Sequence, residues 1–472
     1  MSRPDKSLEL SQKDMRRLLS EAARRVFSHI RTLPVQPAAD TEGAAELARS
    51  LIEPLPRQGQ PYEELMALLF EKLVPKSYNT PGPGYLAYIP GGGLFHSAVA
   101  DFIADGVNRY VGVWAAAPAL AQLEANVIRW FSEIVGYPQT ARGILTSGGS
   151  LASFSAIFTA RRERLQDDFL SGIIYASDQT HHSIQKAATL VGFPAANVHV
   201  IGTDAQFRIR LDELERRIAA DRAAGLTPFL VVGNAGTTNT GAIDDLGALA
   251  DLAQRERLWL HVDAAYGGFF MLTDRGREAM KGIERADSLI LDPHKGLFLP
   301  YGTGCLLVRD GEALKRAHAT TADYMPHMQE DPDFVDFCQY SPELSRDFRG
   351  LRAWLPIKMH GIEPFRRNLQ EKLDLAQWAA RRLRKIPGIE IIAEPQLSVL
   401  AFRLVKPALD TVSLNRLNRD LLARINSRQH VHLTATMLGD RYAIRICVLS
   451  FRTHIDRMRA AIRDIRQAAA AS

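Results

Sequence analysis

Short apolar runs alternate with helical patterns between about residues 143 and 308. Helical patterns such as residues 152–166 and 211–224 lie between most of these runs. The runs are apolar throughout, which is typical of parallel strands that helices bury on both faces. The pattern therefore predicts an α/β domain built on a mostly parallel sheet. Its expected strands are residues 143–146, 172–176, 198–201, 229–233, 258–262, 288–291 and 304–308.

Two further regions flank this domain, and a chain of 472 residues is long enough for about three structural units. Helical patterns at 6–31 and 42–73 precede it, and stretches rich in glycine and proline at 81–84 and 90–93 predict a boundary. Long helical patterns and a few strands follow it. We expect an N-terminal helical flap at 1–92, a large domain at 93–352 and a small α+β domain at 353–472. In the small domain, the expected helices are 353–386 and 412–428, and the expected strands are 398–404 and 442–447.

The charge balance excludes little, because the formal net charge is only +5. Residues 351–472 hold 22 Lys and Arg against 10 Asp and Glu, interleaved with apolar residues at helical spacing. That spacing indicates a solvated helical surface rather than a nucleic-acid site.

Three distant cysteines without a CxxC motif predict neither a disulfide framework nor a zinc site, and we expect no metal. The absence of long apolar segments predicts no membrane association and a cytoplasmic protein.

Polar residues cluster directly after the predicted strands, where open parallel sheets bind their ligands. Small residues at 146–150 precede a helix and suit an anion held by backbone N–H groups. Polar loops at 177–182 and 234–238 follow two other strands. Taken alone, each of these loops is better explained as an ordinary capped or polar turn.

Asp263 and Lys295 are more specific, because each follows a strongly apolar strand. A buried carboxylate needs a partner, and lysine is rarely buried without a reason. A lysine whose pKa is lowered can form a Schiff base. Together with a nearby histidine and the loop at 146–150, these residues match what pyridoxal 5'-phosphate requires.

On these motifs the chain resembles the pyridoxal-phosphate-dependent group II amino acid decarboxylases, which include aromatic-L-amino-acid decarboxylase. The resemblance extends over roughly residues 8–460 and is most specific at 261–266 (HVDAAY) and 293–295 (PHK). The segments 114–118, 178–181 and 346–354 support it. It implies fold type I, the aspartate-aminotransferase fold, with an N-terminal flap. It also implies a homodimer whose active site lies at the subunit interface.

The resemblance also implies roles for individual residues. Lys295 forms the Schiff base with the cofactor, Asp263 pairs with its pyridine nitrogen, and His181 stacks on its ring; these three are the catalytic residues. The remaining cofactor-binding residues are Gly149, Ser150, Thr238, Ala265 and His294. The implied reaction converts an L-amino acid to its amine and CO2 through an external aldimine and a quinonoid. The family often has Asn where this chain has Asp292, to which no role is assigned.

Substrate residues are implied in the same way, with an aromatic amino acid as the default substrate. Val111 and Val113 would serve the partner subunit's site. Arg445 either binds the substrate carboxylate or forms a structural ion pair in the small domain. The other implied substrate residues are Tyr88, Pro90, Gly91 and Trp114.

One position departs from the family pattern. The family carries a tyrosine on a mobile loop that protonates the reacting carbon, and an ungapped alignment back from Arg346 places Phe337 there. Phenylalanine at that position is associated with aldehyde synthases, which consume O2. Tyr324, Tyr340 or His327 could supply the proton instead. We therefore predict a decarboxylase, with an oxidative aldehyde synthase as the alternative, and an aminotransferase or a non-catalytic cofactor-binding scaffold less favoured.

Overall fold

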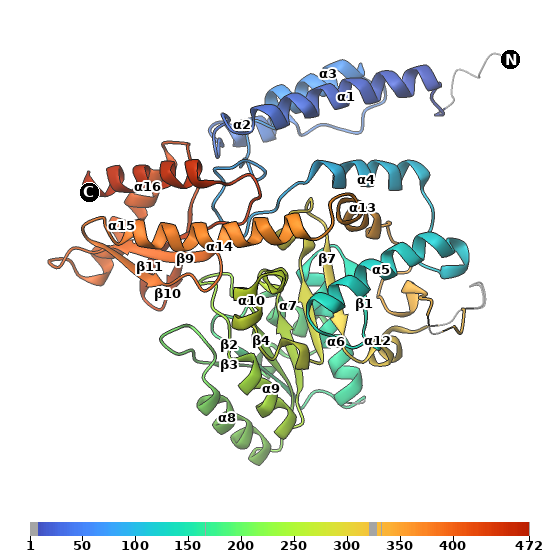
Figure 1. The fold of residues 1–472 in the computed structure, drawn as a ribbon, viewed down its shortest axis with the longest axis vertical. Helices are drawn as coiled ribbons and strands as arrows, with labels where there is room; N and C mark the ends of the chain where they lie inside the picture. Colours follow the sequence, from blue (N-terminus) through green and yellow to red (C-terminus); the bar gives the residue numbers. More distant parts are fainter. Residues whose placement is uncertain (1–7, 166, 321–327, 332, 472) are drawn as a thin grey trace.

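The computed structural model describes residues 8–165, 167–320, 328–331 and 333–471. A seven-stranded sheet has the order β1-β7-β6-β5-β4-β2-β3 (Figure 1). Neighbouring strands pair in parallel from β3 to β6, whereas β7 is antiparallel to both β6 and β1. The predicted mostly parallel sheet is confirmed. Its strands are β1 (Arg142–Thr146), β2 (Gly172–Ser177), β3 (Val198–Ile201), β4 (Thr227–Asn234), β5 (Trp259–Asp263), β6 (Ser288–Leu291) and β7 (Gly304–Val308).

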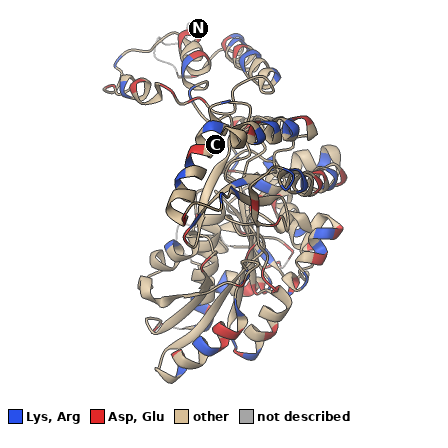
Figure 2. Cartoon of the chain, turned by 90° about the vertical axis from the view of Figure 1, so that its left-hand side faces the viewer, with Lys and Arg blue, Asp and Glu red and all other residues tan. Residues whose placement is uncertain are grey.

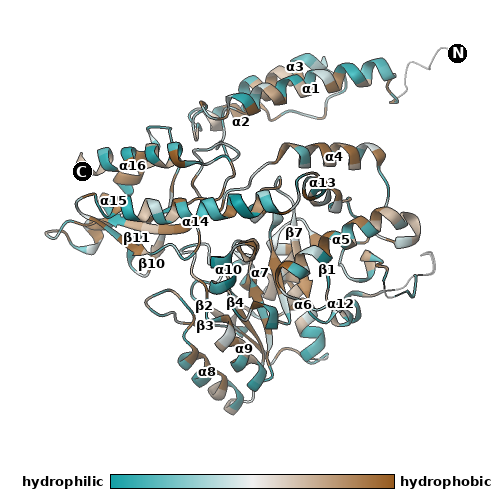
Figure 3. Cartoon of the chain, viewed as in Figure 1, coloured by the Kyte–Doolittle hydropathy of each residue, from teal (hydrophilic) through white to brown (hydrophobic). Residues whose placement is uncertain are grey.

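Helices pack along the faces of this sheet, and every residue of β2, β6 and β7 is buried. Figure 3 shows the apolar colour concentrated on the strands and on the helix faces turned toward them. Full burial on both faces explains why these strands read as continuous apolar runs. The surrounding helices are α5 (Pro118–Ile134), α6 (Gly149–Arg164), α7 (Ser183–Leu190), α8 (Leu211–Ala223), α9 (Leu246–Arg255), α10 (Asp274–Ala279) and α12 (Gly311–His318).

A second, antiparallel sheet has its own apolar core and the order β10-β11-β9-β8. Leu400 and Phe402 from β9 and Ile444 from β11 are fully buried in that core. The strands are β8 (Ile389–Ala393), β9 (Val399–Leu404), β10 (Thr434–Leu438) and β11 (Arg441–Cys447), and α15 (Thr411–Asn426) and α16 (Ile455–Ala470) accompany them.

The single helix predicted at 353–386 is wrong, because the chain forms two helices there. Helix α13 (Gly350–His360) ends at Gly361, whose φ of +68° lies in the left-handed region that glycine adopts without a steric penalty. Helix α14 (Glu363–Leu383) then begins with a proline in its first turn, where proline is well tolerated. The glycine and proline at this junction are the local cause of the break.

The N-terminal helices project from one end of the molecule (Figures 1 and 2). They are α1 (Gln12–Thr32), α2 (Ala44–Ser50) and α3 (Tyr62–Ala67), followed by a π-helical turn at Leu68–Leu73. No residue of α1 is buried, and its apolar side chains Met15, Leu19 and Phe27 are exposed. Helix α4 (Phe95–Val107) also exposes Phe102. Within the described residues, no helix is long and apolar enough to cross a bilayer.

A buried ion pair fixes the end of β1. Arg346 Nη2 lies 2.6 Å from Glu124 Oε1 on α5, and both side chains are fully buried. Arg346 and Arg349 each donate a hydrogen bond of 3.1 Å to the carbonyl oxygen of Leu145. Because Leu145 is the penultimate residue of β1, this cluster holds in place the end of the strand that leads into the loop at Ser147.

Breaking this pair should destabilise the protein strongly. In Glu124→Gln the Arg346 charge remains buried without its counter-ion, and we expect a loss of about 3–5 kcal/mol in unfolding free energy. Urea unfolding followed by tryptophan fluorescence measures the difference. The matched control is Glu278→Gln, which removes an exposed pair with Lys281 and should change stability by less than about 0.5 kcal/mol. Equal losses in the two variants would contradict the assignment.

Candidate active site

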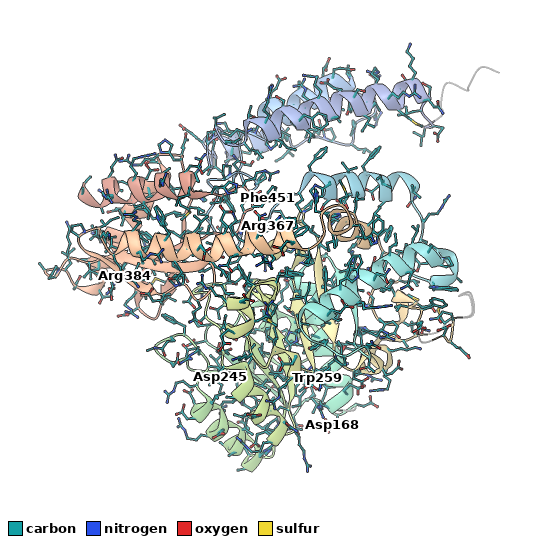
Figure 4. The ribbon with its side chains drawn as sticks, viewed as in Figure 1. Asp168, Asp245, Trp259, Arg367, Arg384 and Phe451 are labelled. Atoms are coloured by element: carbon teal, nitrogen blue, oxygen red, sulfur yellow. The ribbon has the colours of Figure 1, made fainter. Side chains whose placement is uncertain are left out.

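A cavity of about 310 Å³ lies at the carboxyl ends of the large-sheet strands. Its size is at the small end of the usual range for ligand sites, about 300–1,000 Å³. Trp259 begins β5 low in Figure 4, and the strand runs from there to Asp263 at the cavity. All eight residues predicted to bind the cofactor line this cavity: Gly149, Ser150, His181, Thr238, Asp263, Ala265, His294 and Lys295.

One side of the cavity is suited to an anion. Helix α6 begins there at Gly149, and no side chain caps its first turn. The uncapped N–H groups and the helix dipole therefore favour a negative group. A Cβ on Gly149 would lie 3.1 Å from Asp292 Oδ2 and 3.5 Å from the Ala265 Cβ, so the loop has little space for a side chain.

Lys295 lies in the short helix α11 (Pro293–Gly296), and its Nζ is 2.8 Å from Asp292 Oδ2. Burial alone would lower the pKa of Lys295, but the charge and hydrogen bond of Asp292, and then the charge of Asp263, raise it above its usual value. The pKa of Lys295 is therefore raised, whereas Schiff-base lysines in general have a lowered pKa. The cause is the Asp292 carboxylate, which stabilises the ammonium form.

Asp263 has a different environment from Asp292. The backbone N–H of Ala265 donates a 3.2 Å hydrogen bond to Asp263 Oδ1. Burial raises the pKa of Asp263, and the charge of Lys295 opposes this. In the described part of the chain, no basic side chain forms an ion pair with Asp263. This carboxylate is therefore available to a cationic group of a ligand.

Two histidines complete the polar lining. His181 Nδ1 lies 2.9 Å from Ser183 Oγ, and burial, followed by the charges of His182 and Lys295, lowers the pKa of His181 to about 4. His181 is therefore a neutral ring at neutral pH. His294 Nδ1 lies 2.6 Å from the carbonyl oxygen of Thr303, so this nitrogen is the donor.

Sequence reasoning missed two contributors to the cavity. Asp292 was assigned no role, but it forms the ion pair with Lys295. Tyr266 also lines the cavity, and its hydroxyl lies 2.7 Å from Ser398 Oγ beside the small sheet. Both residues stood within the quoted motifs or beside them, but sequence spacing does not reveal these side-chain contacts.

None of the seven predicted substrate residues lines this cavity. Val111 and Val113 are buried in their own chain, and Trp114 stacks on Phe334 with ring centroids 4.5 Å apart. Tyr88 is 53% exposed, and Pro90 is buried. The backbone N–H of Gly91 donates a 3.3 Å hydrogen bond to the Tyr301 hydroxyl. Their roles stay predictions.

Arg445 is buried and donates hydrogen bonds to backbone carbonyl oxygens. Its guanidinium contacts the carbonyls of Asn239 at 2.9 Å and Tyr88 at 3.3 Å, and also that of Thr238. Among the residues that the structure describes, Arg445 has no ion-pair partner. The structural ion pair considered for it is therefore wrong, and it instead ties the loop at Thr238 to the loop at Tyr88.

Phe337 lies in the core rather than at the cavity. It is fully buried, the Arg346 guanidinium lies 5.0 Å from its ring centroid, and it lines a separate cavity of about 320 Å³. Tyr340 is also buried, and burial raises its pKa. Tyr324 and His327 lie outside the described residues.

Three comparisons relate this chain to known proteins. Residues 46–405 match the family model described as the pyridoxal-dependent decarboxylase conserved domain. An aromatic-L-amino-acid decarboxylase from Bacillus atrophaeus is 35% identical over 454 residues, covering 96% of this chain and 95% of the relative. The solved structure of Oryza sativa TDC with PLP and tryptamine superposes with a TM-score of 0.94 at 26% identity, covering 98% of this chain and 99% of that one. A Rhodiola rosea 4-hydroxyphenylacetaldehyde synthase shares the fold, with a TM-score of 0.90 at 24% identity and the same coverage.

These similarities confirm fold type I and pyridoxal 5'-phosphate as the cofactor. The cavity fits that group on its own chemistry. It offers an uncapped helix end for a phosphate, an amine for an aldehyde, and an unpaired carboxylate for a pyridine nitrogen.

Lys295→Ala tests the attachment point. Treating the cofactor-loaded protein with borohydride should fix the cofactor covalently to the wild type but not to this variant, because among the described residues no other lysine lines the cavity. Peptide mass spectrometry after digestion locates the label. Lys281→Ala, which removes an exposed amine, should be labelled like the wild type. A label retained in Lys295→Ala would overturn the assignment.

Proposed function

The chain belongs to the family of pyridoxal-dependent decarboxylases and is a carboxy-lyase; from this premise we propose that it converts an aromatic L-amino acid to the corresponding amine and CO2. The observation that carries the proposal is the convergence of Lys295, Asp263 and His181 on one cavity beside the uncapped start of α6. The relative from Bacillus atrophaeus, similar over nearly its whole length, supports an aromatic substrate.

Each side chain then has a task that follows from its environment. When bound, the cofactor supplies an electron sink for the bond that breaks at the substrate's α-carbon. Lys295 Nζ would hold the cofactor as a covalent imine. Asp263, which has no ion-pair partner among the described residues, would keep a proton on the pyridine nitrogen. His181, a neutral imidazole at neutral pH, would lie against the ring.

The anion-binding side orients these groups. The first N–H groups of α6, together with Ser150 and His294, would bind the phosphate, and Thr238 and Ala265, which line the same cavity, would border the ring. The narrow space at Gly149 keeps the backbone close to the anion. The orientation of the substrate, rather than a further reactive group, would then decide which of its bonds breaks.

A second copy of the chain is part of the proposal. Helices α1 and α4 expose Leu19, Phe27, Phe102 and Ile103, and helices with exposed apolar faces normally pack against another surface. A homodimer would cover these faces. We also retain 1–92, 93–352 and 353–472 as the proposed domain boundaries.

The choice between amine and aldehyde does not depend on Phe337 in this proposal. The Phe337 ring is enclosed by Arg346 and the core. It therefore does not reach the substrate and does not affect whether the α-carbon is protonated. The Rhodiola rosea synthase shares the fold, but at 24% identity this likeness is evidence for the fold alone and not for the reaction.

A product assay tests the reaction. With a panel of L-amino acids, we expect aromatic members to yield equal amounts of amine and CO2 without O2 uptake. Phe337→Tyr should leave the ratio of amine to aldehyde unchanged, because the new hydroxyl remains in the core. Chromatography and an oxygen electrode provide the readouts. Aldehyde formed with O2 uptake would favour the synthase, and a keto acid without CO2 would indicate an aminotransferase.

Phe102→Glu tests the dimer. A charge on the exposed apolar face of α4 should weaken self-association at least about tenfold, since burying an unpaired carboxylate is costly. Sedimentation equilibrium measures the dissociation constant. Asp105→Asn, on the same helix, is the control and should change it by less than about twofold. A monomeric wild type, or an unchanged constant in Phe102→Glu, would contradict the proposal.

A further inference from the structure

We propose that Asp292 is the counter-ion that holds Lys295 as an ammonium before the cofactor binds, so that breaking this ion pair limits the rate of cofactor uptake. The inference rests on the proposed function, because it takes Lys295 as the attachment point. Asp292 is a positioning residue in this account, since it acts through Lys295.

The local fold makes this contact hard to avoid. Asp292 is 2% exposed and lies between the end of β6 and the start of α11. Its carbonyl oxygen accepts hydrogen bonds from the N–H groups of Lys295 at 2.8 Å and Gly296 at 3.2 Å. This turn places the two side chains on the same side, with Nζ 2.8 Å from Oδ2.

Only one of the two nearby carboxylates pairs with the amine. Lys295 forms an ion pair with Asp292, and among the described residues it forms none with Asp263. Asp263 therefore stays available for the pyridine nitrogen, whereas Asp292 occupies the amine that must react. Among the described residues, Asp292 Oδ1 is buried without a hydrogen-bond partner, and His294 Nε2 lies 3.7 Å from Oδ2. The 2.8 Å contact with Lys295 is thus much shorter than the contact with His294.

The protonation state of Lys295 matters because only the neutral amine attacks an aldehyde. The ammonium first gives one proton to solvent. The amine then forms a C–N bond to the aldehyde carbon, and the aldehyde oxygen leaves as water with the two remaining amine hydrogens. Burial lowers the pKa of Lys295, but Asp292, together with the charge of Asp263, raises it by more. Each unit of pKa above the working pH costs about a factor of ten in reactive amine.

Other titratable groups also face the Lys295–Asp292 pair. Their pKa shifts keep them neutral, so they do not control how the uptake rate depends on pH in the alkaline range. Burial lowers the pKa values of His181 and His294 and raises those of Cys305 and Cys447, so all four are neutral near pH 8. Asp263 is present in both the wild type and Asp292→Asn, so it does not account for a difference between their uptake rates. The groups that face Lys295 and Asp292 are Asp263 on β5, His181 before α7, His294 on α11, Cys305 on β7 and Cys447 on β11.

Asp292 also faces the anion side of the cavity. Both of its carboxylate oxygens lie within 3.4 Å of the place that a Cβ on Gly149 would occupy. Its charge could therefore act on a phosphate as well as on Lys295. An aldehyde without a phosphate separates these effects.

The test follows cofactor uptake by stopped-flow absorbance between pH 6.5 and 10. Cofactor-free wild type and Asp292→Asn are mixed with pyridoxal 5'-phosphate and, separately, with phosphate-free pyridoxal. At pH 7.5 Asp292→Asn should react at least about tenfold faster with both aldehydes, and its profile should move at least about one pH unit toward acid. The control is Asp221→Asn, a buried carboxylate outside the cavity that bonds to the Tyr175 hydroxyl at 2.8 Å, and it should match the wild type.

Several results would overturn the inference. An unchanged or slower uptake rate in Asp292→Asn contradicts it. A rate that rises with pyridoxal 5'-phosphate but not with pyridoxal shows that Asp292 acts on the phosphate instead. If Asp292→Asn does not fold, the wild type decides: its uptake rate should rise through pH 9, and a plateau below pH 8 refutes the ion pair. A wild type that gains no borohydride-fixed cofactor refutes the proposed function, whereas normal fixation with unaltered Asp292→Asn kinetics refutes only this inference.

Discussion

The site depends on the common direction of six strands in the large sheet. β1 and β6 are both antiparallel to β7, which lies between them, so β1 runs in the same direction as β2 to β6. The loops after β1, β2, β4, β5 and β6 therefore meet at one edge, where parallel sheets bind ligands. The close contact of Gly304 with the backbone of Gly148 secures this arrangement, because a Cβ on Gly304 would lie 2.5 Å from the Gly148 carbonyl carbon.

Charge is distributed unequally over this edge. A positive helix end and an amine stand opposite two carboxylates, of which one is paired and one is not. In a buried site such charges are stable only when they are paired or when a ligand completes them. Among the described residues Asp263 has no ion-pair partner and the start of α6 has no side-chain cap, so a bound cofactor would stabilise both. In the proposed uptake, the Lys295–Asp292 pair is the contact that the cofactor replaces.

Local apolar patterns predicted the strands of the large sheet, and the family resemblance predicted cofactor residues that the structure brings to one cavity. Apolar runs located the strands of the large sheet to within about two residues, and the residues that follow those strands face the cavity. Contacts between side chains were harder to foresee. The pairing of Asp292 with Lys295 and the burial of Phe337 under Arg346 depend on distances that motif spacing does not encode. The break at Gly361 was missed because the apolar pattern continues across it.

The central claim is that this cavity removes the carboxylate of an aromatic L-amino acid and leaves a proton at the α-carbon. The most direct measurement incubates the cofactor-loaded protein in D2O with a substrate whose carboxyl carbon is 13C. The account predicts labelled CO2 and an equal amount of amine carrying a single deuterium at the α-carbon. Labelled CO2 accompanied by an aldehyde, or a keto acid that retains the label, would contradict it.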